Sequence, residues 1–289
     1  MRYYKIAGIV FKISGTDERI RRLMSQYEVS ERAYDVYVDV SDAENIPMPE
    51  QIAVIRSGKL RTYATTENGY LTYDVMDGDK LIALIEMDKS IARAKIIARD
   101  IEGLGGASLS VRKFNMLSEV FKYAALVRHG LVFHSSALST KGSAILFSAP
   151  SGTGKSTHTG LWCEYVAGSE VFNDDSPAIM IENGEVVAYG TPWSGKSDIN
   201  KNVRLDVKAI VFLERGLENQ IEPLEKRERF LRFVGQSFCA PFTSLLGITL
   251  DLQEKICSQV PMFKLKCNIS EQAVKTVYEQ VFEGESYEG

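Results

Sequence analysis

The chain has 289 residues, of which 45% are hydrophobic and 25% charged, so it is long enough to bury one large core or two modest ones. Its net charge of -4 argues against a dedicated nucleic-acid-binding protein, which would usually carry a basic excess. No apolar run reaches the roughly 18 residues of a membrane span, and the four scattered cysteines include no CxxC pair, so we expect a cytoplasmic protein in a reducing compartment.

The N-terminal part of the chain favours β-strands joined by short turns. One early helix is expected at 17–27. Apolar or alternating runs predict strands at 4–13, 34–40, 52–56, 59–65, 70–76, 80–87 and 91–98. Ser57-Gly58 and Asp77-Gly78-Asp79 are typical of hairpin turns. The pattern predicts a meander-like sheet in a β-rich domain of residues 1–107, which could recognise a substrate.

The remainder of the chain indicates an α/β domain. A glycine-rich segment at 101–108 predicts a connector, and a long helix is expected at 111–128. Strands are then expected at 131–138, 143–149, 177–181, 186–189, 207–214 and 262–266, and helices at 155–166, 225–238, 244–258 and from Ser270 onward. The fold class is therefore α/β, or α+β for the whole chain, with a second domain at 108–289.

Two segments resemble the phosphate-binding pattern GxxxxGK[ST], and only one has the right surroundings. Residues 190–197 match it letter for letter, whereas 149–156 match it with Ala149 in place of the first glycine. A phosphate loop needs a strand before it and a helix directly after it, because loop amides and the helix N-terminus together bind the anion. Residues 149–157 have both neighbours, whereas the polar run after Ser197 has no apolar face for a helix. We therefore expect ATP at the first loop.

The first loop assigns roles to its own residues. Lys155 would reach the terminal phosphates, and the Ser156 hydroxyl would be a ligand of Mg²⁺. The expected nucleotide-binding set is Ser151, Gly152, Thr153, Gly154, Lys155, Ser156 and Thr157. Ser194 and Lys196 of the second segment are candidate substrate contacts, and Lys201 and Arg204 are further basic residues near them.

Adjacent acids follow the loop at Asp174 and Asp175. One carboxylate could hold Mg²⁺ while the other accepts the proton of an attacking hydroxyl group. His134 precedes the loop, on the expected strand 131–138. Lone histidines of this kind are more often structural, so its residue type alone does not give it a role.

The stretch from His134 through Gly142 and Ser151 to Asp174-Asp175 resembles the catalytic domain of the HPr kinase/phosphorylase family, and more loosely the PEP carboxykinase-like nucleotide-binding fold. The resemblance implies ATP, Mg²⁺ and phosphorylation of a hydroxyl group. By matched position it implies Lys155 on the phosphates, Ser156 and Asp174 at the metal, Asp175 as base and His134 beside it, with the roles of the two acids exchangeable. It also implies a homo-oligomer.

The chain departs from that family in two places. Residues 190–202 replace the glycine-rich stretch expected after the acidic pair, and residues 260–267 replace the late arginine-containing loop. The chain is thus more similar to relatives that act on other hydroxyl acceptors, such as serine or a Ser of a peptide or protein, than to a kinase of HPr itself. A non-catalytic ATP-binding or ATP-sensing protein is the main alternative. A decarboxylating carboxykinase is disfavoured because the chain has only three histidines for such a site.

Overall fold

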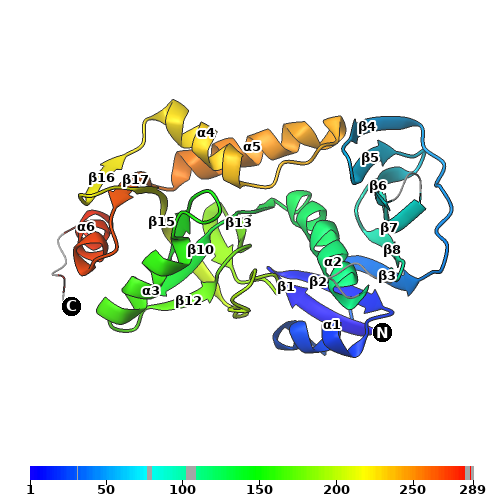
Figure 1. Ribbon diagram of the computed structural model, residues 1–289, viewed down its shortest axis with the longest axis horizontal. Coiled ribbons are helices and arrows are strands. Elements are labelled where there is room, and N and C mark those ends of the chain that lie inside the picture. Colours follow the sequence, from blue (N-terminus) through cyan, green and yellow to red (C-terminus); the bar gives the residue numbers. More distant parts are fainter. Residues whose placement is uncertain (31, 77–79, 102–108, 284–286, 288–289) are drawn as a thin grey trace. The chain divides into compact units, whose positions relative to one another are not determined.

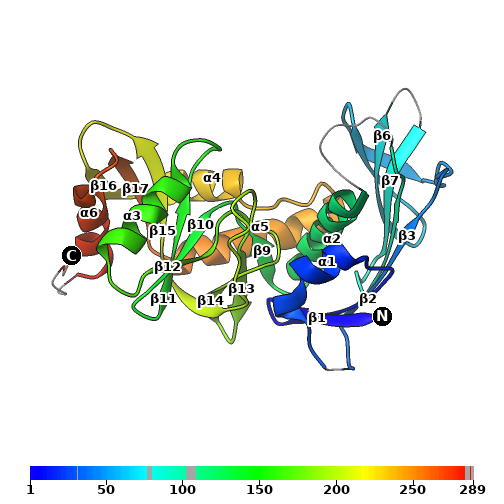
Figure 2. The same cartoon turned by 60° about the horizontal axis from the view of Figure 1, so that its bottom comes forward.

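The computed structural model describes residues 1–30, 32–76, 80–101, 109–283 and 287. Within them the fold is a mixed α/β arrangement with two β-sheets (Figures 1 and 2). One compact unit comprises Met1–Arg128 with Ala240–Thr249, and the other comprises His129–Cys239 with Leu250–Gly289. None of the described helices has the length and apolarity needed to cross a membrane.

The first unit contains an eight-stranded sheet in the described part of the chain, in the order β1-β2-β3-β8-β7-β6-β5-β4. Its strands are β1 (Arg2–Ile6), β2 (Ile9–Ser14), β3 (Val36–Asp42), β4 (Ala53–Ser57), β5 (Arg61–Thr65), β6 (Gly69–Met76), β7 (Lys80–Asp88) and β8 (Arg93–Ala98). Its helical elements are α1 (Glu18–Leu23), the short 3-10 helix η1 (Ser25–Tyr27) and α2 (Leu109–Leu126). Strands β4 to β8 form an antiparallel meander, but β3 runs parallel to both β2 and β8.

Two predictions for the first unit need correction. The expected single strand 4–13 is a hairpin, because Ala7 and Gly8 both adopt positive φ (49° and 78°) and reverse the chain between β1 and β2. The sheet is also not a pure meander, because the segment containing α1 carries the chain from β2 to a parallel neighbour.

The expected domain boundary at 107/108 lies outside the described residues, as do the connector at 102–108 and the turn at 77–79. The division of the described structure differs from that boundary, since α2 belongs to the first unit. Its buried side chains pack against β7 and β8.

The second unit is built on a sheet ordered β12-β10-β11-β15-β14-β13-β9 among its described strands, with β17 paired to β15 and β16 to β17. Its strands are β9 (Gly130–Val132), β10 (Ser136–Thr140), β11 (Ser143–Ser148), β12 (Glu170–Asn173), β13 (Ala178–Glu182), β14 (Glu185–Tyr189), β15 (Arg204–Arg215), β16 (Gln220–Pro223) and β17 (Met262–Cys267). Its helices are α3 (Lys155–Tyr165), α4 (Lys226–Gln236) and α6 (Glu271–Val281), and it shares α5 (Thr243–Gln259) with the first unit.

Along strand β15, the burial of each residue depends on which strands pair with it. Its first residues alternate between exposed and less exposed, where it pairs with the antiparallel β14. Residues 209–213 are all buried, where β15 runs parallel to both β11 and β17. A continuous apolar run is what a strand covered on both faces requires. This central strand therefore places its C-terminal end next to the end of β11.

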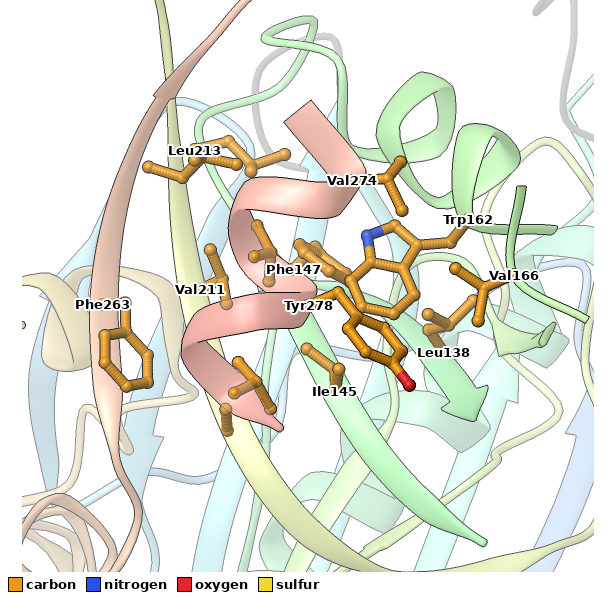
Figure 3. Close-up of a cluster of buried hydrophobic side chains, with 14 of the residues drawn as sticks. Leu138, Ile145, Phe147, Trp162, Val166, Val211, Leu213, Phe263, Val274 and Tyr278 are labelled. Carbon is orange, nitrogen blue, oxygen red and sulfur yellow. The ribbon is translucent and has the colours of Figure 1, made fainter. Parts of the chain in front are cut away.

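A hydrophobic cluster holds α3 and α6 against one face of this sheet (Figure 3). Trp162 of α3 is fully buried and contacts both Phe147 of β11 and Tyr278 of α6, with ring centroids 5.9 and 6.2 Å apart. Aromatic side chains of this size bury a large apolar area. These contacts hold α3 against both β11 and α6.

Candidate functional site

The segment between β11 and α3 forms a tight loop of residues 149–154, called the glycine loop below. Gly152 and Gly154 adopt φ values of 79° and 121°, which favour glycine. A Cβ added at either glycine would meet no described heavy atom within 4 Å, so their Cα atoms border open space. Gly154 is the N-cap of α3 and provides no side-chain cap. Uncapped amides at a helix N-terminus suit an anion.

Lys155 is the first residue of α3, and its side chain is held beside the glycine loop. Its Nζ lies 3.0 Å from the carbonyl oxygen of Ala149 and 2.9 Å from Nε2 of His134. The residue is only 9% exposed. Burial lowers the pKa of Lys155, while the carboxylates of Asp175 and Asp174 oppose that shift. An ammonium group is thus positioned where loop and acidic pair meet.

His134 lies between β9 and β10, not within one continuous strand as the sequence predicts. Strand β9 pairs with β13, whereas β10 pairs with β12. The chain therefore leaves its position beside β13 before it joins β12. The backbone at His134 is fixed by its N–H, which donates to Gln236, and by its carbonyl, which accepts from Ser148 at 2.7 Å. The break in the strand turns the imidazole toward Lys155 and Asp175.

The imidazole connects the lysine to one acid. Nδ1 of His134 lies 3.3 Å from Oδ1 of Asp175, on the opposite side of the ring from Lys155. An ammonium group can only donate and a carboxylate can only accept. A neutral imidazole with its proton on Nδ1 satisfies both neighbours at once. The geometry therefore favours this tautomer and orients the ring between two opposite charges.

Asp174 faces the hydroxyl groups of two serines. Its Oδ2 accepts from Ser156 at 2.9 Å, and its Oδ1 accepts from Ser136 at 2.7 Å. Thr159 of α3 lies 2.9 Å from Ser136 and continues the network into the helix. Carboxylate and hydroxyl oxygens are the ligands that Mg²⁺ prefers, and Ser156 and Asp174 are adjacent. The side chains at this position therefore fit a magnesium ion.

The turn after β12 fixes the direction of Asp175. Oδ1 of Asn173 accepts from the backbone N–H groups of Asp175 and Ser176, at 3.1 and 2.8 Å. The carboxylate of Asp175 binds His134 and the hydroxyl of Ser176. The hydrogen bond from His134 is the largest influence on the pKa of Asp175, which lies below its ordinary value despite partial burial. Asp175 is therefore ionised at neutral pH.

The second motif, at 190–197, lies against the same acid. The next element after it is the strand β15 and not a helix, and the chain makes a turn at 195–198. A Cβ on Gly195 would stand 3.0 Å from the Cβ of Asp175. Nδ2 of Asn173 donates to the carbonyl of Thr191 at 3.0 Å and so ties this segment to the acidic turn. The segment is a wall beside Asp175 in this structure, with no strand–loop–helix geometry.

The two candidate substrate contacts have different surroundings. Ser194 is 4% exposed, and its hydroxyl oxygen lies 3.4 Å from Nδ2 of Asn200. Lys196 is exposed on the turn beside Gly195. Lys201 pairs with Glu170, and Arg204 pairs with Glu182 and Asp206. Lys196 is thus the more accessible of the two proposed contacts.

Sequence reasoning missed several residues of this site. Ser136 and Asn173 hold the two acids, and Arg215 at the end of β15 donates to the carbonyl of Gly152 at 2.7 Å. Ser136 lies two residues after His134, a spacing that suggests a shared face. Asn173 precedes an acidic pair, where asparagine commonly forms a side-chain turn. The role of Arg215 depends on the parallel pairing of β11 with β15, which the motif did not indicate.

Comparison with known proteins identifies a family and a distant structural likeness. A family model described as "SynChlorMet cassette protein ScmC" matches residues 107–283. No curated protein matches the chain. Among solved structures, an HPr(Ser) kinase/phosphatase from Coxiella burnetii aligns with 54% of this chain and 99% of its own, at 12% identity and a TM-score of 0.32. That similarity is distant, and the proposals below rest on this chain's own residues.

Proposed function

The chain belongs to the ScmC family, and we propose that it is an ATP- and Mg²⁺-dependent kinase that transfers the γ-phosphoryl group to a hydroxyl acceptor. The observation that carries the proposal is the line Lys155–His134–Asp175, which begins at the glycine loop. The proposal is supported by the position of the Lys155 ammonium group beside the glycine loop and by the ionised carboxylate of Asp175, which contacts the other nitrogen of the same imidazole ring. Phosphoryl transfer needs both groups and little other protein chemistry.

In this proposal the phosphates bind the amides of the glycine loop and the ammonium of Lys155. Ser156 and Asp174 would hold Mg²⁺, which when bound offsets negative charge on the phosphates. Ser151, Thr153 and Thr157 complete the expected nucleotide contacts. The rate acceleration would come from fixed charges and from alignment of the reactants, because the hydrogen-bond donors are already in place before the reaction.

Asp175 would act as the base. The acceptor oxygen forms a bond to the γ-phosphorus while the bond from that phosphorus to the β,γ-bridging oxygen breaks, which releases ADP. The hydroxyl proton passes to the carboxylate of Asp175. His134 is a positioning residue, because its Nδ1–H fixes the direction of that carboxylate. Serine, or a Ser of a peptide or protein, is the proposed class of acceptor, with Lys196 at the rim of the site.

The first experiment measures loss of the labelled γ-phosphate of ATP with Mg²⁺ in the presence of free serine, Ser-containing peptides or water alone. We expect acceptor-dependent turnover that disappears in Lys155→Ala. Lys226→Ala, which removes an exposed lysine of α4, is the matched control and should retain full activity. Tight ATP binding with no turnover on any acceptor would favour an ATP-sensing protein. Full turnover in Lys155→Ala would place the active site elsewhere.

A further inference from the structure

Arg215 is the last residue of β15, and its side chain contacts the backbone of the glycine loop. Nη2 of Arg215 donates to the carbonyl oxygen of Gly152 at 2.7 Å, and Nε lies 3.5 Å from the carbonyl oxygen of Thr153. One guanidinium group thus faces two consecutive carbonyls of the loop. Arginine suits this arrangement because its N–H donors form a rigid, planar fork.

The sheet determines where this guanidinium group can reach. Parallel pairing places Ser148 of β11 opposite Phe212 of β15, so the residues that follow the two strands leave the sheet side by side. Residues two apart on a strand share a face, and Leu213 belongs to the cluster beneath α3 and α6 (Figure 3). Arg215 therefore projects on the α3 side of the sheet, where the glycine loop runs.

The backbone at Arg215 is held in place, and its guanidinium group has no acidic partner. Arg215 lies opposite Cys267 of β17, and the N–H of Gly216 donates to the carbonyl of Cys267 at 2.9 Å. None of the described carboxylates forms an ion pair with Arg215, whereas the neighbouring Glu214 pairs with Arg232. No described acid therefore competes with the loop carbonyls for this cation.

The direction of these carbonyls decides where the N–H groups of the loop point. The described peptide bonds are all trans, and in a trans peptide the C=O and N–H groups lie on opposite sides. The N–H groups of Thr153 and Gly154 therefore point away from Arg215. The first donates to the carbonyl of Pro150 at 3.2 Å, and the second has no partner among the described groups. The N–H of Gly154 is thus a free donor at the start of α3.

The glycine loop needs a contact of this kind from outside itself. Glycine has access to many backbone conformations, so a loop that contains Gly152 and Gly154 loses much conformational entropy when it is ordered. Neither glycine has a side chain that could hold the loop against its surroundings. A cation on the Thr153 carbonyl also polarises that peptide group, which strengthens the N–H of Gly154 as a donor to an anion.

We infer that Arg215 is a positioning residue of the nucleotide site, which holds the peptide groups of the glycine loop in the orientation for phosphate before a nucleotide binds. The inference rests on the proposed function, because that function supplies the phosphate-bearing ligand. A loop ordered in advance costs less conformational entropy on binding. Loss of Arg215 should therefore weaken the binding of phosphates while Lys155 and Asp175 remain in place.

The first test measures binding of Mg-ATP and of inorganic tripolyphosphate to the whole chain by calorimetry. Arg215→Ala should weaken both ligands by about tenfold, the usual effect of losing one hydrogen bond to a charged group. The two losses should agree within about twofold, because the loop binds the phosphates and not the nucleoside. Arg215→Lys keeps the charge without the fork, so it should regain no more than about threefold of the lost affinity.

The second test measures hydrogen exchange of the Thr153 amide by NMR in the protein without ligand. The hydrogen bond from this amide to Pro150 protects it only while the loop keeps its conformation. Arg215→Ala should raise the exchange rate by about tenfold or more, in line with the loss of affinity. Weaker binding with unaltered exchange would mean that Arg215 attracts or contacts the phosphates directly, and would overturn the positioning role.

Arg204→Ala is the matched control. Arg204 is the first residue of the same strand and pairs with Glu182 and Asp206. Its replacement changes the net charge by the same amount without removing a contact to the glycine loop. Neither affinity nor the exchange rate of Thr153 should change, and a loss equal to that of Arg215→Ala would overturn the inference in favour of a general effect of charge.

The remaining contrary outcomes are distinct. Wild-type affinities in Arg215→Ala would overturn the inference and leave the proposed function standing. Full recovery of affinity in Arg215→Lys would assign the effect to charge alone and would overturn the positioning role. A wild type that binds neither ATP nor tripolyphosphate would overturn both this inference and the proposed function.

Discussion

Nζ of Lys155 lies 2.9 Å from Nε2 of His134, so the lysine assigned to the phosphates is held by the imidazole that orients Asp175. The contact joins two parts of the site that come from different elements, the start of α3 and the break between β9 and β10. Binding a phosphate would compete for the same ammonium protons. In the proposed mechanism, occupancy of the nucleotide site and the surroundings of Asp175 would therefore be coupled through the imidazole ring of His134.

Replacement of His134 tests its positioning role. His134→Ala should lower kcat by about 10- to 100-fold, with little change in KM for ATP. This loss is no larger than the usual effect of removing a general acid or base. The hydrogen bond from His134 lowers the pKa of Asp175, so its removal should raise that pKa and move the acidic limb of the kcat profile to higher pH. A pH–rate profile measures both effects.

His129→Asn is the control for that variant. His129 has a φ of 65°, a conformation that asparagine tolerates, and its kinetics should match those of the wild type. An unshifted acidic limb in His134→Ala would mean that the imidazole has only a structural role.

Gly195→Ala tests the wall beside Asp175. The new Cβ would stand 3.0 Å from the Cβ of Asp175, a contact that must displace the acid or the turn. We expect turnover to fall, by less than the about 100-fold that a shift of about 1 Å in a reacting group can cost, because the neighbour must give by a few tenths of an ångström, while ATP binding changes little. Steady-state kinetics and nucleotide titration separate the two quantities.

Gly168→Ala provides a matched control. Gly168 has a φ of 75°, similar to the 68° of Gly195, but an added Cβ would meet no described heavy atom within 4 Å. Both variants should lose comparable stability from backbone strain, about 1–2 kcal/mol. Equal loss of turnover in the two would show that strain, and not the contact with Asp175, is responsible.

His158→Gln tests a buried imidazole in the first turns of α3. Burial lowers the pKa of His158 from 6.5 to about 4. Between these values the unfolded chain binds a proton that the native state does not, so stability rises with pH over this range and is constant above about 6.5. This pKa shift changes the free energy of unfolding by about 3 kcal/mol at most.

The measurement is urea unfolding at several pH values from 4 to 7. Glutamine does not titrate, and its side-chain oxygen can still accept from the indole N–H of Trp162. The free energy of unfolding of the variant should therefore depend less on pH between 4 and 7 than that of the wild type. Parallel curves for the two proteins would mean that another group carries the acid sensitivity.

Ser270→Ala tests the start of α6. The Ser270 hydroxyl accepts from the backbone N–H of Ala273 at 3.3 Å and so caps the helix. Its loss should lower the free energy of unfolding by about 1 kcal/mol. Ser258→Ala is the control, because that exposed hydroxyl donates to the carbonyl of Lys255 from inside α5 and does not lie at a helix N-terminus, and its effect should stay within about 0.5 kcal/mol.

Local sequence signals predicted most of the elements. Hairpin turns such as Asn183-Gly184 have φ values of 51° and 88°, as that dipeptide favours, and the expected strands β13 and β14 flank it. The helix after the glycine loop and the N-cap at Ser270 also lie where their patterns place them. These features depend on neighbours in the chain, which is why residue order is sufficient to find them.

The features that could not be predicted depend on distant partners. The run 131–138 predicts a single strand, but the chain is interrupted at His134, between β9, which pairs with β13, and β10, which pairs with β12. The approach of Gly195 to Asp175 and of Arg215 to Gly152 likewise depends on sheet order. Periodicity in a single chain indicates which residues are buried, but not which strands become neighbours.

Phe242 contacts Tyr63, Tyr70 and Tyr123, and all four belong to the first compact unit although Phe242 follows most of the second unit in the chain. During synthesis, residues 1–128 therefore emerge without the ring that completes this aromatic group. The first unit can gather its sheet early, but its final packing must wait for the chain to reach residues 240–249. The order of translation thus differs from the order in which this core can be completed.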